Sequence, residues 1–144
     1  MEKIGLVTIT FNSEDVINGF LDSALNQSFQ NFIIYIIDNH SQDETESIIK
    51  SYDDNRIVFI KNHKNLGVAK ANNQGIKLAL KENCSQVLII NNDIDFEEKL
   101  IEKMLGVQNQ KDCSLVAPKM MYFENPDYIW YAGSSFVKKK GYIP

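Results

Sequence analysis

The sequence predicts an α/β fold with a mostly parallel central sheet flanked by helices. Two observations support this fold class: four short apolar runs alternate with segments of helical periodicity, and polar side chains follow every run. Strands that alternate with amphipathic helices form right-handed βαβ units, and their strands lie parallel. A chain of 144 residues that is 44% hydrophobic is long enough to bury one core, so a single domain is expected.

The fourth apolar run is the best defined of the predicted strands. Residues 87–90 are all branched aliphatics, and an unbroken run of this kind is typical of a strand that is buried on both faces. We therefore expect this strand at the centre of the sheet. The other predicted strands of the sheet are residues 4–10, 32–37 and 56–60.

Each predicted strand leads into a predicted helix. The third helix is expected at residues 68–82, where small residues recur on one face and suit close packing on a sheet. The expected caps of the other helices are Ser13 or Asn12 for the first, the capping-box pair Ser41 and Glu44 for the second, and Asp95 with Glu98 for the fourth. Farther along the chain, short strands are predicted at residues 113–117, 128–132 and 135–137.

Composition narrows the classes of partner and the cellular location. The net charge of −4 gives no general attraction to nucleic acid, so that partner class is disfavoured. Cys84 and Cys113 lie far apart without metal-type spacing, which favours reduced thiols in a cytosolic protein. The longest apolar run has six residues, against roughly 20 needed to span a bilayer. We expect a cytoplasmic protein whose membrane contact is at most peripheral, at the inner face.

Four polar junctions are predicted to meet at the carboxyl edge of the sheet. They are residues 10–13, 38–41, 62–65 and 91–93. In parallel sheets, the loops at this edge form the ligand site. No glycine-rich phosphate loop of the dinucleotide-binding or P-loop type occurs. The convergence of four such junctions therefore predicts a site of a different type.

Two carboxylates at this edge are candidate ligand contacts. Asp93 follows the fourth strand and is either a cap or solvated turn residue, or a ligand of Mg²⁺, which one or two carboxylates and substrate phosphates can hold. Asp38 follows the second strand, where its carboxylate can accept hydrogen bonds from a base or a ribose. The alternative for Asp38 is capping of the next helix, a role that Ser41 is expected to fill.

The polar junctions also resemble the motifs of a known family. Residues 7–13, 37–41 with Asp43, 65–76 and 88–93 follow one another in the order and spacing of family 2 glycosyltransferases. The resemblance is greatest to the rhamnosyltransferase-like branch, which residues 118–119 and 130–133 also match. It implies the GT-A fold, a Rossmann-like nucleotide-binding fold, over nearly the whole chain.

The resemblance implies roles for individual residues. The turn at residues 10–12 and Asp38 correspond to the wall that holds the base and ribose, and the segment of residues 65–73 closes over the nucleoside. Residues 91–93 stand where the family has its Asp-x-Asp motif, with Asn91 in place of the first carboxylate. The implied nucleotide-sugar-binding residues are Thr10, Phe11, Asn12, Asp38, Asn39, Asn65, Gly67, Asn73, Asn91 and Asn92, and Asp93 is the implied ligand of Mg²⁺ or Mn²⁺.

The resemblance further implies a glycosyltransferase of cell-surface polysaccharide synthesis. A nucleotide-diphosphate sugar would donate its sugar to a hydroxyl of a glycan or lipid-linked acceptor by a metal-assisted inverting displacement. We expect donor-binding βα units at residues 1–110 and the start of the acceptor side at 111–144. The family's catalytic base is expected downstream of this chain, so we assign none. The alternative is a catalytically silent nucleotide-sugar-binding half-domain that needs a partner or self-associates as a homo-oligomer.

Overall fold

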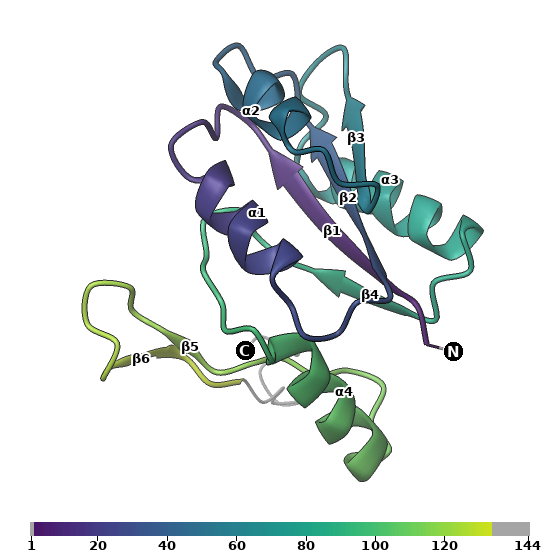
Figure 1. Cartoon of the computed structure of the whole chain (residues 1–144), viewed down its shortest axis with the longest axis vertical. Coiled ribbons are helices and arrows are strands. Elements are labelled where there is room, and N and C mark those ends of the chain that lie inside the picture. Colours follow the sequence, from purple (N-terminus) through teal and green to yellow (C-terminus); the bar gives the residue numbers. More distant parts are fainter. Residues whose placement is uncertain (1, 134–144) are drawn as a thin grey trace, which may run out of the picture. The chain divides into compact units, whose positions relative to one another are not determined.

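A computed structural model of the chain describes residues 2–133 and contains two compact units, which divide between Lys99 and Leu100. The first unit alternates strands and helices, as the sequence predicts (Figure 1). Its elements are β1 (Ile4–Thr10), α1 (Ile17–Leu25), β2 (Phe32–Asp38), α2 (Thr45–Ser51), β3 (Ile57–Lys61), α3 (Val68–Lys81) and β4 (Gln86–Ile89).

The four strands of the first unit form one parallel sheet in the order β3-β2-β1-β4. β1 and β2 are therefore the central strands, and almost all of their residues are buried. The prediction that the strand at residues 87–90 lies at the centre is wrong. Within residues 2–133, β4 is an edge strand of this sheet, and Ile89 is 54% exposed. An apolar run indicates that a strand packs against a hydrophobic core. It does not determine whether the strand lies at the centre or at the edge of the sheet.

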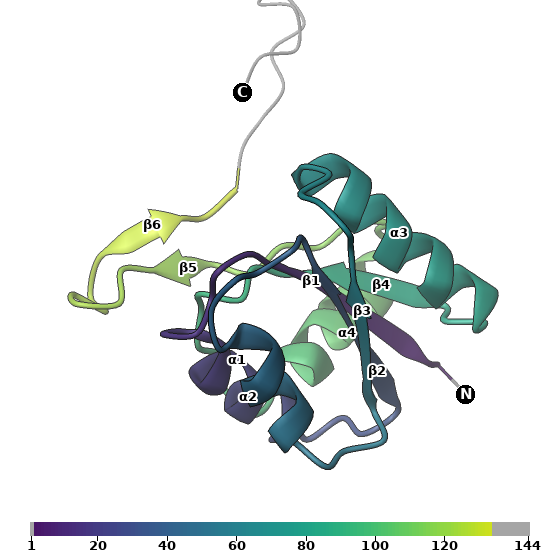
Figure 2. The same ribbon diagram turned by 90° about the horizontal axis from the view of Figure 1, so that it is seen from above.

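Helices cover both faces of this sheet: α3 lies on one face, and α1 and α2 lie on the other (Figure 2). Two glycines allow α3 to approach the central strand closely. A Cβ on Gly5 of β1 would lie 2.5 Å from Cβ of Ala79, and a Cβ on Gly75 of α3 would collide with the side chain of Val7. The small-residue face that the sequence predicts for this helix is thus the face that packs on the sheet.

The predicted helix caps are wrong for the first, second and fourth helices. α1 and α2 begin at Ile17 and Thr45, and the side chains of their N-cap residues, Val16 and Glu44, accept no capping hydrogen bond. The serine hydroxyls are used elsewhere: Oγ of Ser13 accepts a hydrogen bond from the backbone N–H of Phe11, and Oγ of Ser41 donates to Asp38. Short polar side chains can bond to loops as readily as to helix ends, and here the loop contacts prevail.

Asp95 also has a different place from the one predicted. The fourth helix, α4 (Leu100–Lys111), begins five residues later in the chain. The carboxylate of Asp95 instead lies beside α1, where Oδ1 is 3.0 Å from the position that a Cβ on Gly19 would occupy. The segment between β4 and α4 is further joined to the loop after α1, because Nε2 of the buried Gln27 donates to the backbone carbonyl of Glu97 at 2.8 Å.

The second unit contains α4 and a short antiparallel pair, β5 (Met120–Met121) and β6 (Ile129–Tyr131). β6 confirms the strand predicted at residues 128–132. The strand predicted at 113–117 is wrong, because no strand forms there and Leu115 is 88% exposed. A strand needs a neighbour to complete its hydrogen bonds, and none pairs with this segment in the described chain. The strand predicted at 135–137 lies outside the described residues.

Across residues 2–133, no helix combines the length and the apolar character that crossing a bilayer requires.

Candidate active site

The loops that follow the strands are tied together at the carboxyl edge of the sheet. The backbone N–H of Asn39 donates to the carbonyl of Thr10 at 2.8 Å, and that of Asn62 donates to the carbonyl of Asp38 at 2.8 Å. On the other side of β1, the N–H of Ile90 donates to the carbonyl of Val7 at 3.0 Å. The predicted convergence of the four polar junctions is therefore confirmed.

A pocket of about 440 Å³ opens among these loops. This volume lies within the range of small-molecule sites. Its polar lining comes from the loops and from α3, and its apolar lining comes from the ends of β1 and β4, from Phe11 and from Val68. The lining residues are Ile9, Phe11, Ser13, Asn39, Asn65, Gly67, Val68, Asn72, Ile89, Ile90, Asn91 and Asn92. The pocket thus combines an apolar floor with amide side chains that can both donate and accept hydrogen bonds.

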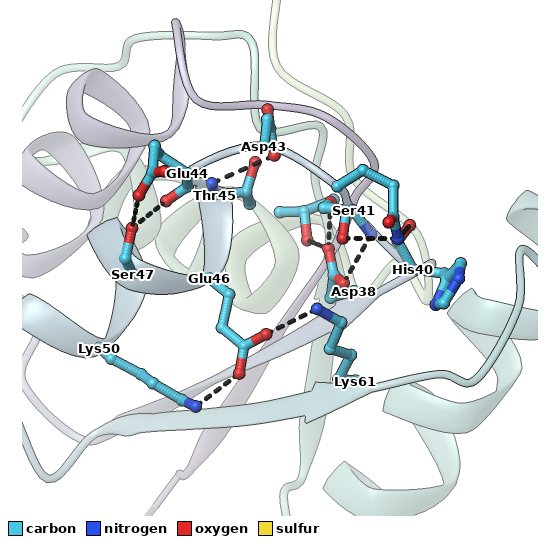
Figure 3. Close-up of polar contacts among 12 residues, drawn as sticks. Asp38, His40, Ser41, Asp43, Glu44, Thr45, Glu46, Ser47, Lys50 and Lys61 are labelled. Carbon is cyan, nitrogen blue, oxygen red and sulfur yellow. Dashed lines mark hydrogen bonds and ion pairs between the residues drawn. The ribbon is translucent and has the colours of Figure 1, made fainter.

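Asp38 is an internal anchor of this edge. Its side chain is fully buried and accepts a hydrogen bond from Oγ1 of Thr10 at 2.8 Å and from the backbone N–H of Ser41 at 2.9 Å. Oγ of Ser41 donates a further hydrogen bond to the carboxylate (Figure 3). Asp38 and Thr10 do not line the pocket. In this structure they fix the loops after β1 and β2, and a direct contact of Asp38 with a ligand stays a prediction.

Asn12 continues the network between the two loops. Its φ of 51° lies in the left-handed region, which asparagine tolerates better than most residues. Its backbone N–H donates to Oγ of Ser41 at 2.9 Å, and its Oδ1 accepts from the N–H of Gln42 at 2.9 Å. Asn12 does not line the pocket either, and its contacts explain how the turn that carries Phe11 is held.

An ion-pair cluster joins α2 to β3 beside this network (Figure 3). The carboxylate of Glu46 accepts hydrogen bonds from Nζ of Lys50 and, at 2.7 Å, from Nζ of Lys61. These two hydrogen bonds lower the pKa of Glu46 to about 2. The hydrogen bond to Glu46 also raises the pKa of Lys61 above its usual value. The cluster is a structural contact between two elements that bear the site.

The segment after β4 presents a different group of oxygen and nitrogen atoms. Asn91 and Asn92 line the pocket, and the exposed Asp93 follows them directly. Nδ2 of Asn92 is buried and has no hydrogen-bond partner among residues 2–133, which leaves a donor available for a bound ligand. No three His, Cys, Asp or Glu side chains gather into a metal cluster within that range. A divalent cation bound here would therefore need oxygen atoms from a bound small molecule in addition to the carboxylate of Asp93.

The predicted site residues divide into two groups. Six of them line the pocket: Phe11, Asn39, Asn65, Gly67, Asn91 and Asn92. Thr10, Asn12, Asp38, Asn73 and Asp93 do not, although they lie in the same loops or next to lining residues. The sequence prediction missed Ser13, Val68 and Asn72 and the apolar residues Ile9, Ile89 and Ile90.

The helical spacing of α3 could have predicted that Asn72 lines the pocket. Asn73 is exposed, whereas Asn72 is half-buried and lines the pocket. Asn72 lies four residues after Val68 and three residues before Gly75, so helical spacing places it on the face that packs on the sheet. The helical spacing of α3 therefore distinguishes the pocket-lining Asn72 from the exposed Asn73, although the two residues are adjacent in the sequence.

Comparison with known proteins identifies the family. Residues 6–143 match the family described as Glycosyl transferase family 2. The chain belongs to this family. An Escherichia coli relative, UDP-Glc:alpha-D-GlcNAc-diphosphoundecaprenol beta-1,3-glucosyltransferase WfaP, is 38% identical over 79 residues, which cover 55% of this chain and 32% of the relative. Glycosyltransferase GlyG of Streptococcus pneumoniae is 26% identical over 94% of this chain and 46% of the relative. The chain thus spans about a third to a half of the length of these relatives.

Solved structures show that this member of glycosyl transferase family 2 has the GT-A fold. Residues 1–349 of S. aureus TarS superimpose with a TM-score of 0.66 and 23% identity over 75% of this chain and 32% of that solved chain. Mannosyltransferase PcManGT from Pyrobaculum calidifontis, solved with GDP-Man and Mn²⁺, gives a TM-score of 0.64 and 16% identity over 74% of this chain and 32% of that protein. The fold class predicted from the sequence is therefore confirmed.

Proposed function

We propose that this chain binds a nucleotide-diphosphate sugar and takes part in the transfer of that sugar to a hydroxyl acceptor. The observation that carries the proposal is the pocket at the carboxyl edge of the sheet, which is lined by amide side chains that include Asn91 and Asn92, with Asp93 next to them in the chain. Two findings from relatives support it: the matched proteins are named glycosyltransferases, and TarS has been solved with UDP and with UDP-GlcNAc.

The pocket suggests how the donor would lie. β1 separates β2 and β3 from β4 in the sheet, so the loops after β2 and β3 form one end of the pocket and the loop after β4 forms the other. We assign the diphosphate to the end with Asn91 and Asn92, because the unpartnered Nδ2 of Asn92 can donate to a phosphate oxygen. The base and ribose then extend toward Asn39, Asn65 and Gly67, and the ring of Phe11 offers a stacking surface.

Asp93 is the residue we assign to a divalent cation, Mg²⁺ or Mn²⁺. A hard cation prefers oxygen ligands, and one carboxylate with two phosphate oxygens and water fits the donor set at this end of the pocket. A cation bound here would neutralise negative charge on the departing diphosphate. The Mn²⁺ reported with PcManGT supports this assignment. Asn91 and Asn92 are neutral, so residues 91–93 supply a single negative charge, that of Asp93.

The reaction we propose is a single inverting displacement. A base takes the proton of the acceptor hydroxyl, the oxygen forms a bond to the anomeric carbon, and the bond from that carbon to the phosphate oxygen breaks. The nucleoside diphosphate leaves with the bonding electron pair. Within this scheme the residues of the pocket bind and orient the donor, and we assign the base to no residue of this chain.

The biological setting is inferred from relatives and motifs. WfaP is named for a diphosphoundecaprenol acceptor, and another relative is named a putative teichuronic acid biosynthesis glycosyltransferase. These names support a role in cell-surface polysaccharide synthesis with a glycan or lipid-linked acceptor, at the inner face of the membrane. The motifs at residues 118–119 and 130–133 support the rhamnosyltransferase-like branch and an acceptor-side role for the second unit.

Calorimetric titration with UDP, dTDP and GDP, each with and without Mn²⁺, tests the proposal. We expect one of these nucleotides to bind, with higher affinity when Mn²⁺ is present. Asp93→Ala should remove the enhancement by Mn²⁺ and keep the metal-independent affinity, whereas Asp53→Ala, an exposed carboxylate after α2, should behave as wild type. Absence of binding under all conditions would refute donor binding, and equal enhancement in wild type and Asp93→Ala would refute only the metal assignment.

A further inference from the structure

Asn39 lines the pocket with an amide group whose orientation is fixed. The residue is only 2% exposed. Its Oδ1 accepts a hydrogen bond from Nδ2 of Asn62 at 3.0 Å and from the backbone N–H of Leu66 at 3.4 Å. A backbone N–H can only donate, so the atom that faces Leu66 must be the oxygen of the Asn39 amide. The reversed amide would bring two donors together.

Asn62 and Gln74 complete a chain of three amides from different elements. Nδ2 of Asn62 donates to Oε1 of Gln74 at 3.0 Å, and Nε2 of Gln74 donates to Oδ1 of Asn62 at 3.0 Å. Both hydrogens of the Asn62 amide are therefore used, one toward Gln74 in α3 and one toward Asn39 after β2. Because each amide can reverse only if its partner also reverses, the backbone contact at Leu66 sets the orientation of all three.

This chain of amides determines what Asn39 offers to a ligand. Its oxygen is engaged, and its Nδ2 meets no acceptor in the part of the chain that the structure describes. We propose that Asn62 and Gln74 are positioning residues that hold Asn39 so that its N–H donates to a carbonyl oxygen of the nucleobase. The inference rests on the proposed function, and it adds which group of the nucleobase the pocket recognises.

The position of Asn39 indicates which carbonyl is recognised. Asn39 follows β2, on the opposite side of β1 from the loop assigned to the diphosphate. A base bound there would direct the edge farthest from the ribose toward Asn39. At that edge uracil and thymine carry O4 and guanine carries O6, whereas cytosine and adenine carry an amino group. An amino group would place a donor against the fixed donor of Asn39, so we expect the pocket to select keto bases.

Matched pairs of nucleotides test this selection: UDP against CDP, and GDP against ADP, titrated with Mn²⁺ in a calorimeter. In the pair that contains the tightest-binding nucleotide, the keto nucleotide should bind roughly tenfold more tightly than the amino nucleotide. The reason is that a buried donor left without an acceptor lowers the affinity by about that factor. Asn39→Asp keeps the oxygen that Asn62 and Leu66 contact and replaces the donor by an acceptor. In this variant the ratio of the two affinities should fall to one or reverse.

Gln74→Met tests the positioning role, because methionine keeps the size of the side chain and removes the hydrogen bonds to Asn62. The ratio of keto to amino affinities should fall at least about threefold. Lys77→Met is the matched control, since Lys77 is exposed on the same helix, and its ratio should equal that of wild type. The ratio is the decisive readout, because a general loss of stability would lower both affinities together.

The outcomes separate this inference from the proposed function. If wild type binds nucleotides without a preference for keto bases, or if Asn39→Asp keeps the wild-type preference, the recognition by Asn39 is refuted and donor binding still stands. If Gln74→Met keeps the full preference, the positioning role is refuted. If neither these four nucleotides nor dTDP binds, the proposed function fails and the inference fails with it.

Discussion

At the scale of single residues, Asp38 shows how a polar side chain can serve a site from which it is hidden. The carboxylate is fully buried, and three groups donate hydrogen bonds to it from the two loops that it joins. A buried carboxylate is tolerated only when hydrogen bonds replace its lost hydration. The sequence places this carboxylate at the carboxyl edge of the sheet. Its complete burial depends on its contacts with Thr10 and Ser41, which the sequence alone does not show.

Asp38→Asn should destabilise the fold. The new amide would direct an NH₂ group toward the hydroxyls or the backbone N–H that now donate to the carboxylate, so at least one buried donor would lose its acceptor. We expect the free energy of unfolding to fall by about 2 kcal/mol, measured by urea denaturation. The control is Asp53→Asn on the exposed surface. A loss as small as that of the control would contradict the anchoring role.

Also at this scale, the two neighbouring asparagines of α3 mark a limit of sequence reasoning. The motif pattern selects Asn73, whereas the structure places Asn72 in the pocket. The difference between them is one step of helical rotation, which depends on which residues of α3 face the sheet. Those residues are the small ones, Ala71, Gly75 and Ala79, and all three are buried.

At the scale of elements, the packing of α3 on β1 depends on the missing side chain of Gly75. Gly75→Ala should lower the free energy of unfolding by about 1–3 kcal/mol, because the added methyl would collide with Val7. Gly106→Ala is the matched control within another helix. A Cβ on Gly106 would meet nothing within 4 Å, so this change should be neutral or stabilise by up to about 1 kcal/mol through helix propensity. Urea denaturation of both variants measures the difference, and equal effects would contradict the close helix–sheet contact.

The contact between α2 and β3 should make stability depend on pH. The pKa of Glu46 is about 2 in the folded protein and 4.5 without its partners, so its contribution is fully present above about pH 4.5. It is lost as the pH falls from 4.5 toward 2, because the unfolded chain takes up the proton first. Subtracting the urea midpoints of Glu46→Gln from those of wild type across this range should show a difference that declines with acidity. A difference independent of pH would exclude the ion pairs as its cause.

The elements that the sequence predicts correctly share one physical basis. The four parallel strands and the helices between them follow from periodicity, which reports the burial of whole segments. Helix starts are predicted less well. Ser13 and Ser41 bond to Phe11 and Asp38 within the same strand-to-helix junctions, and Asp95 lies beside Gly19, which is distant in sequence. The edge position of β4 likewise depends on the crossover order β3-β2-β1-β4, which no local pattern of residues 87–90 contains.

At the scale of the whole molecule, the polar junctions become a site because a parallel sheet brings the carboxyl ends of its strands together. Residues separated by as many as 83 positions in the chain, Ile9 and Asn92, line one pocket for this reason. Membership in glycosyl transferase family 2 and the GT-A fold agree with that arrangement. The names of the relatives support the transferase role that we propose.

The most direct test of this account is to locate the bound nucleotide by NMR. Spectra of the ¹⁵N-labelled chain, recorded with UDP or GDP and Mg²⁺, should show shifts concentrated at Phe11, Asn39, Gly67 and Asn91, which line the pocket. Replacing Mg²⁺ by Mn²⁺ should broaden signals most strongly around Asp93. Shifts that cluster away from the carboxyl edge of the sheet, or broadening centred on another carboxylate, would contradict the proposal that this edge holds a metal-bound nucleoside diphosphate.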